Sequence, residues 1–152
     1  MLLPVVVLLT AAWSCNQTTA QKVVNKVAVL NKGYADSIMA LHKGGDLTDD
    51  QERQHLGWSR RVAEIGTSAS TAFLAGDNTT ALSQINLGIG VLDDALNNGL
   101  VGIKNEAKRN EISGAILAIR GLFTTAAAFI TKTPAITKGV TVWQPQYSPS
   151  FA

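Results

Sequence analysis

Apolar residues recur at steps of three and four positions along most of the chain, and short breaks divide this pattern into four segments. Such spacing places the apolar side chains of a segment on one face of an α-helix. The residues that break or end the segments are Gly44, Gly45, Gly76, Asn98, Gly99 and Pro134. Because short connections force consecutive helices to lie antiparallel, we expect residues 16–133 to form an all-α, up-down four-helix bundle.

Capping residues indicate where these helices begin. Thr48 and Gln51 have the spacing of a capping box, which gives the second helix the clearest start in the chain. The other helices are expected to begin at Thr18 or Thr19, at Asp77 or Asn78, and near Ile103. The stripes predicted to face the core are, in chain order, Val23, Val27, Leu30, Tyr34, Ile38 and Leu41; His55, Trp58, Val62, Ile65, Ala69 and Ala72; Leu82, Ile85, Ile89, Leu92 and Leu96; and Ile112, Ile116, Ile119, Phe123 and Ile130.

A second stripe on the fourth helix consists of small residues spaced seven apart. Residues at this spacing lie nearly above one another along a helix, so the stripe would let another backbone come close. We expect the small residues of the second helix, residues 67–72, to pack there. The predicted close-packing seam is Ala107, Gly114, Gly121 and Ala128.

The chain begins with an apolar run that is too short to span a bilayer. From Met1 to Ala12 every residue but Pro4 and Thr10 is hydrophobic, whereas a spanning helix needs about 20 apolar residues. This length is typical of the core of a signal peptide, so residues 1–15 are predicted to be a lipoprotein-like signal segment. The first basic residue is Lys22, so the segment lacks the usual positive start.

Cys15, the one cysteine of the chain, follows this run directly. The sequence Ala12-Trp13-Ser14-Cys15 resembles the bacterial lipobox, with Ala12 in the place of the usual leucine and a bulky Trp13 after it. The resemblance implies cleavage before Cys15, lipidation of its thiol and a membrane anchor at the new N-terminus. Asn16, which is not the aspartate typical of inner-membrane retention, favours the outer membrane.

Two alternatives remain open for this segment. Ordinary signal cleavage after Ser14 would leave a free thiol at the new N-terminus. In the second alternative the segment stays in the domain as a first strand or helix, with Cys15 as a buried structural residue. A single cysteine cannot form an internal disulfide, so the compartment has to be inferred from the N-terminus alone.

The C-terminal residues 134–152 lose the helical periodicity. Their prolines restrict the backbone, so we expect an extended tail. The tail is too apolar for a linker, and we expect it to pack back on the bundle, with the docking of a partner as the alternative. Its prolines and large apolar residues are Pro134, Val140, Val142, Trp143, Pro145, Tyr147, Pro149 and Phe151.

Charge is sparse and unevenly placed. Charged residues make up 16% of the chain and the net charge is +2, which is too weak a field for a nucleic-acid groove. The first helical segment has four lysines and one aspartate, and the fourth has five basic and two acidic residues. Because these helices are neighbours in an up-down bundle, we expect a basic side that faces anionic head groups or a protein partner. The alternative is a plainly solvated surface.

The sequence offers little support for catalysis. Glu52 and His55 have the Glu-x-x-His spacing found in di-iron bundles, but a second such motif is missing. Gly88 and Gly90 lack the third glycine and the preceding strand of a dinucleotide-binding loop, and no serine or threonine has a glycine-framed elbow. We therefore expect no enzymatic activity, no cofactor and no metal site.

These features predict a non-enzymatic, exported helical bundle, namely a small bacterial lipoprotein that acts as an interaction or structural module of the cell envelope. It would be lipid-anchored at Cys15, or else free in the periplasm. One alternative is a membrane-active, pore-former-like protein with spans at 1–14 and 114–130, although Arg120 near the middle of the second span opposes insertion. Another is small-ligand binding in the bundle core, since glycine-rich seams can leave cavities.

Overall fold

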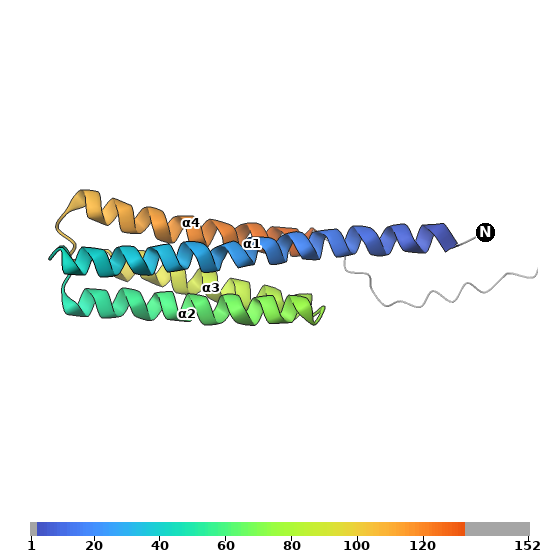
Figure 1. Ribbon diagram of the computed structural model, residues 1–152, viewed down its shortest axis with the longest axis horizontal. Coiled ribbons are helices and arrows are strands. Elements are labelled where there is room, and N and C mark those ends of the chain that lie inside the picture. Colours follow the sequence, from blue (N-terminus) through green and yellow to red (C-terminus); the bar gives the residue numbers. More distant parts are fainter. Residues whose placement is uncertain (1–2, 133–152) are drawn as a thin grey trace, which may run out of the picture.

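The computed structural model describes the backbone of residues 3–132 and the side chains of residues 19–132. Within this range the chain forms four α-helices and no strand: α1 (Leu3–Lys43), α2 (Asp49–Leu74), α3 (Asn78–Asn98) and α4 (Glu106–Thr131). Figure 1 shows the helices side by side, and α1 and α3 each contact both α2 and α4. The prediction of an all-α bundle of four helices is confirmed for these residues.

Side-chain caps define where α2 and α3 begin. Thr48 Oγ1 accepts a hydrogen bond from the Gln51 backbone N–H at 3.3 Å, and Gln51 Oε1 accepts one from the Thr48 backbone N–H at 2.9 Å. This is the capping box that the sequence predicts. Asp77 caps α3 by accepting from the Thr80 N–H at 2.9 Å. A second hydrogen bond, from the Thr80 hydroxyl, lowers the pKa of the Asp77 carboxyl.

The predicted start of the first helix is wrong. α1 begins at Leu3 and not at Thr18 or Thr19. The reason is that no glycine or proline occurs between Pro4 and Gly33, and a first helical turn accommodates a proline such as Pro4. The helix therefore passes through residue 15 without a break.

The fourth helix begins at Glu106, three residues later than the sequence predicts. Gly102 has a φ of 81°, a left-handed conformation that interrupts an α-helix, and Asn105 then caps α4 by accepting from the Lys108 N–H at 3.3 Å. The extended tail predicted for residues 134–152 lies outside the described residues.

One side of each helix contributes to a single, shared hydrophobic core. All six residues predicted for α2 are buried, and so are Ile112, Ile116, Ile119 and Phe123 of α4. On α1 the predicted residues Val27, Tyr34, Ile38 and Leu41 are buried, whereas Val24 and Asn31 are buried where Val23 and Leu30 were expected. Leu30 is 40% exposed. Asn31 is thus a polar residue within the otherwise apolar buried stripe of α1.

The predicted close-packing seam on α4 faces outward. Its members Ala107, Gly114 and Gly121 are exposed, Ala128 is half-buried, and a Cβ at Gly114 or Gly121 would meet no atom within 4 Å. α4 contacts α1 and α3 and lies diagonally across the bundle from α2, so residues 67–72 do not reach it. None of the other described helices therefore packs onto this seam.

Close packing occurs instead at Gly88 of α3. A Cβ at this position would lie 2.7 Å from Cε2 of Phe123, which is fully buried on α4. The aromatic ring thus occupies the space that a side chain on Gly88 would need. A glycine here lets a large ring fill the interface between α3 and α4.

Candidate functional site

The N-terminal part of α1 is the feature that most distinguishes this bundle. α1 has 41 residues and is about 60 Å long at 1.5 Å per residue. Its first turns extend past the ends of α2, α3 and α4 (Figure 1). Cys15, the predicted lipidation site, lies in this part of the helix, and its side chain is outside the described set.

Charge is divided along the bundle axis. From Ile65 to Leu92 the one charged residue is Asp77, and from Ile112 to Thr131 it is Arg120. Together with residues 19–31 of α1, these segments form what we call the low-charge half. Residues 32–64 and 93–111 form the polar end, which holds ten of the chain's eleven acidic residues.

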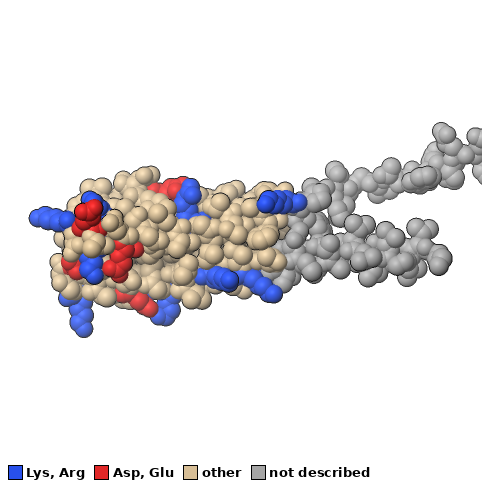
Figure 2. All heavy atoms as spheres, turned by 90° about the horizontal axis from the view of Figure 1, so that it is seen from above, with Lys and Arg blue, Asp and Glu red and all other residues tan. Residues whose placement is uncertain are grey.

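Figure 2 shows this division on one face of the bundle. The acidic side chains visible there lie toward the end where α1 joins α2 and α3 joins α4, and the opposite third of the bundle shows only lysine and arginine among its charged side chains. The low-charge half is the part next to the projecting start of α1 (Figure 1). The bundle therefore has an acid-poor end from which an apolar helix projects.

The charge of the predicted basic side of α1 and α4 is partly neutralised by an ion pair. The two helices are neighbours, as expected. However, Arg120 pairs with Asp93 of α3 at 2.6 Å, and this hydrogen bond raises the pKa of the Arg120 guanidinium. Among the described residues Lys22 and Lys26 take part in no ion pair, so their charges remain available in the low-charge half.

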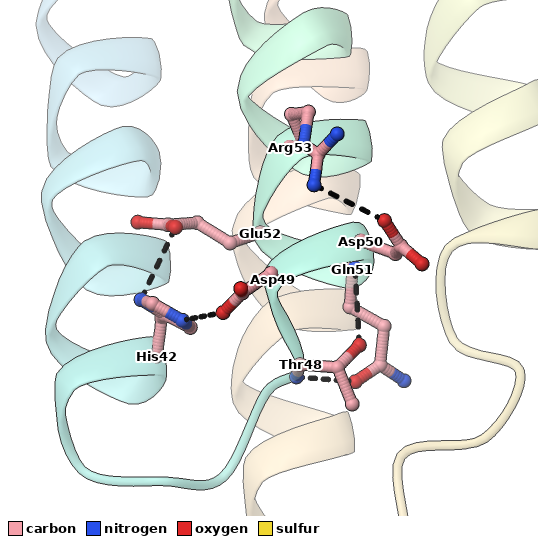
Figure 3. A network of polar contacts seen from close by, with 7 residues as sticks. All are labelled: His42, Thr48, Asp49, Asp50, Gln51, Glu52 and Arg53. Carbon is pink, nitrogen blue, oxygen red and sulfur yellow. Dashed lines mark hydrogen bonds and ion pairs between the residues drawn. The ribbon is translucent and has the colours of Figure 1, made fainter.

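At the polar end, His42 joins the end of α1 to the start of α2 (Figure 3). Its Nε2 lies 2.8 Å from Asp49 Oδ1, and its Nδ1 lies 3.1 Å from Glu52 Oε2. Both partners are carboxylate oxygens, which only accept hydrogen bonds when ionised. These side chains, with Arg53 and Arg60, line a surface hollow of about 510 Å³.

A buried polar chain connects α1, α2 and the end of α3 close by. His55 is fully buried, its Nε2 lies 2.9 Å from Gly99 O, and its Nδ1 lies 2.6 Å from the Tyr34 hydroxyl. Because Gly99 O can only accept, Nε2 carries the proton and Nδ1 accepts from Tyr34. Burial lowers the pKa of His55 and raises that of Tyr34.

Gly99 completes this arrangement because it has no side chain. A Cβ there would lie 2.6 Å from Cζ3 of Trp58 and 2.7 Å from Cε1 of His55. The Trp58 indole N–H donates to Asp94 Oδ2 at 2.8 Å, which ties α2 to α3 a second time. We interpret the role of this network as structural, because its polar groups satisfy one another's hydrogen-bonding capacity.

The Glu-x-x-His pair does not form a site. Glu52 turns to His42 on the surface, whereas His55 turns inward to Tyr34 and Gly99. Within the described residues no three His, Cys, Asp or Glu side chains are grouped so that they could hold a metal ion.

A groove of about 390 Å³ separates the middle parts of α1 and α2. Val24, Val27 and Val62 form its buried apolar lining. It exists because the facing positions are small, and a Cβ at Gly66 would meet no atom within 4 Å. The residues that line the groove are Val24, Asn25, Val27, Ala28, Asn31, Lys32, Val62, Ala63, Gly66, Thr67, Ser70 and Thr71.

Asn31 is the unusual member of this groove. It is 5% exposed, and its Nδ2 donates to Ser59 O at 2.8 Å. Its Oδ1 is buried and has no hydrogen-bond partner among the described residues. Leaving such an acceptor unsatisfied costs about 1–3 kcal/mol. This site was not predicted from the sequence, although a polar residue such as Asn31 on an otherwise apolar helix face is a signal that could have indicated it.

By length and composition, α4 is the one helix among the described residues that could cross a membrane. Of its most apolar 18-residue window, 22% is buried within the bundle. The core helix of a soluble protein meets the same criterion.

Comparisons with protein-family models, with characterised proteins and with solved structures found no match to this chain. The site is therefore interpreted from its own geometry.

Proposed function

We propose that the protein is an exported helical bundle, tethered to a membrane through a lipid on Cys15, and that it acts by interaction and not by catalysis. The observation that carries this proposal is the projection of the apolar N-terminal helix from the low-charge half of the bundle. A bundle held close to anionic head groups is favoured when few carboxylates face the surface. In this orientation the polar end, with its acidic residues, points away from the membrane toward partners in the envelope.

Lysines in the low-charge half support the same orientation. Lys22 and Lys26 follow the apolar segment within about three helical turns of Cys15. A lipid chain alone gives only marginal membrane binding, and nearby basic residues supply the second contribution that stable anchoring needs. Neither lysine is neutralised by a described carboxylate.

The test is the chemical state of the mature N-terminus in a bacterial host. We expect the wild-type protein to lose residues 1–14, to take up an alkyne-labelled fatty acid and to show the mass of a lipidated Cys15. Cys15→Ser should abolish labelling. A matched control, Cys15→Ser with Ser68→Cys on the exposed surface of α2, should also stay unlabelled, because the thiol is then outside the signal segment. A mature protein that keeps Met1 and an unmodified Cys15 would rule out the proposal.

A second candidate function is membrane insertion through α4, with residues 1–14 and 114–130 as spans. The apolar character of α4 is the observation that favours it. Against it stands the pairing of Arg120 with Asp93, since insertion would separate or bury both charges. Alkaline carbonate extraction of a chain that begins at residue 16 distinguishes the two functions. A tethered bundle without its lipid should be released, whereas a spanning protein should stay in the membrane fraction.

A further inference from the structure

We propose that the groove between α1 and α2 binds a small, neutral, mostly apolar molecule that carries one hydrogen-bond donor, and that Asn31 Oδ1 accepts from this donor. This inference goes beyond the tether and does not depend on it. It rests on the coincidence of an open groove of about 390 Å³ with a buried acceptor that has no partner among the described residues.

The orientation of the Asn31 amide is fixed by α2. Its Nδ2 donates to Ser59 O at 2.8 Å, so the amide cannot turn over without losing this hydrogen bond. The unsatisfied atom is therefore Oδ1, which is buried beside the groove and can only accept. A bound molecule must supply the donor.

The hydroxyl groups around the groove do not supply a donor. Thr67 donates to Ala63 O at 3.0 Å, and Thr71 donates to Thr67 O at 3.0 Å. Ser70 donates across the groove to Asn25 Oδ1 at 3.4 Å. The donor that remains free is Nδ2 of Asn25, on an exposed side chain. The free atom that is buried, Asn31 Oδ1, is an acceptor and requires a ligand with a hydroxyl or N–H group.

Charge complementarity selects a neutral ligand. The one charged residue that lines the groove is Lys32, and its Nζ pairs with Asp36 at 2.6 Å on the exposed side of α1. The valine lining adds an apolar floor, and a groove of this volume is at the small end of those that hold drug-sized ligands. A molecule of one or two rings with a single donor meets these requirements.

The probes that test the proposal are indole and benzofuran, which have nearly the same shape and differ in the indole N–H. We would titrate each into isotope-labelled full-length protein in lipid nanodiscs and follow the Asn31 side-chain amide and the Ala28 and Ala63 methyl groups by NMR. Indole is expected to shift these signals saturably and to bind about fivefold more tightly than benzofuran, because only indole satisfies Oδ1.

Two variants keep the test independent of folding. Gly66→Leu fills the groove and should weaken indole binding more than tenfold, whereas the control Gly90→Leu, at an exposed glycine of α3 with equally open space, should not. Asn31→Leu should remove the preference for indole over benzofuran while leaving apolar binding. Circular dichroism confirms that each variant is folded.

Three outcomes would overturn the proposal. The first is the absence of saturable shifts together with a slowly exchanging water at Asn31, which means that the acceptor holds a buried water only. The second is an equal affinity for both probes. The third is indole binding that emerges only with Trp143→Ala, since the groove would then hold a side chain of this chain and no external ligand.

Discussion

At the polar end of the bundle, side chains from three helices are fixed by directed hydrogen bonds, whereas in the low-charge half the same helices meet mainly through apolar contact. Tyr34, His55 and Gly99 form a closed chain of partners at the polar end. In the low-charge half, Phe123 packs over Gly88, and α1 and α2 leave a groove between them. One end of the molecule is therefore specified by the geometry of its hydrogen bonds, and the other by the volumes of its packed side chains.

Removal of a buried aromatic ring should have the largest effect on stability. Phe123→Ala should destabilise the protein by about 3–5 kcal/mol, because the ring is fully buried and leaves a cavity beside Gly88. Tyr34→Phe, which removes one hydrogen bond to His55 at the polar end, should cost less, about 1–3 kcal/mol. Urea unfolding followed by circular dichroism measures both values. An equal or reversed ranking would contradict the division described above.

The next effect concerns charge. In a chain that begins at residue 16, we expect Lys22→Ala with Lys26→Ala to weaken binding to anionic vesicles about 30-fold at low salt, since each cation near the surface contributes about 1 kcal/mol. The matched control replaces Lys43 and Lys104 of the polar end and should have little effect. Vesicle co-sedimentation at two salt concentrations measures the affinity, and equal losses for the two pairs would show that the bundle has no preferred end.

Substitutions at two glycines of α3 test how much close packing between α3 and α4 matters for stability. Gly88→Ala should destabilise the protein by about 1–3 kcal/mol, because the new Cβ would lie 2.7 Å from the Phe123 ring. Gly90→Ala, two residues away with open space around it, should stabilise it by about 0.5–1 kcal/mol through helix propensity. Thermal unfolding of both variants gives the signs. Stabilisation by Gly88→Ala would mean that the ring moves aside without cost.

The smallest effect is the pH dependence at the polar end. Burial lowers the pKa of His55 below its ordinary 6.5, so the unfolded chain takes up a proton there before the folded chain does. This contribution to stability is complete above pH 6.5 and is lost below it, at up to about 1.4 kcal/mol per pH unit. Urea unfolding at pH 7.5 and 5.5 should show a smaller difference for His55→Gln than for the wild type or the control His42→Gln. Equal differences in all three would assign the effect to other groups.

Most of the fold follows from short-range features that can be recognised in the sequence. Thr48 with Gln51 and Asp77 mark helix starts through short-range hydrogen bonds, and Ile112 to Phe123 mark a buried face by their spacing. The start of α1 was missed because a cap residue such as Thr18 begins a helix only where the preceding residues do not already form one.

The candidate sites were harder to predict, because they depend on which residues of different helices meet. The pairing of Asn31 with Ser59, 28 positions along the chain, cannot be inferred from periodicity. The small-residue stripe of α4 was misinterpreted for the same reason. Its spacing shows that the stripe lies on one face of the helix, but it does not show whether another helix packs against that face. The axial division of charge, by contrast, is visible in the sequence as the long stretch from Ile65 to Leu92 with one charged residue.

The unbroken course of α1 has a consequence for the proposed removal of residues 1–14. Proteases accept substrates in extended form, and residue 15 lies inside a helix that continues for 28 residues toward Lys43. If the proposed leader is removed at that point, cleavage must either precede helix formation by these residues or wait for the projecting first turns to fray, as isolated helical turns do readily in water. Cleavage and folding of this chain would then compete. The rate at which the helix of α1 extends from the bundle in the N-terminal direction would determine how long the cleavage site stays accessible.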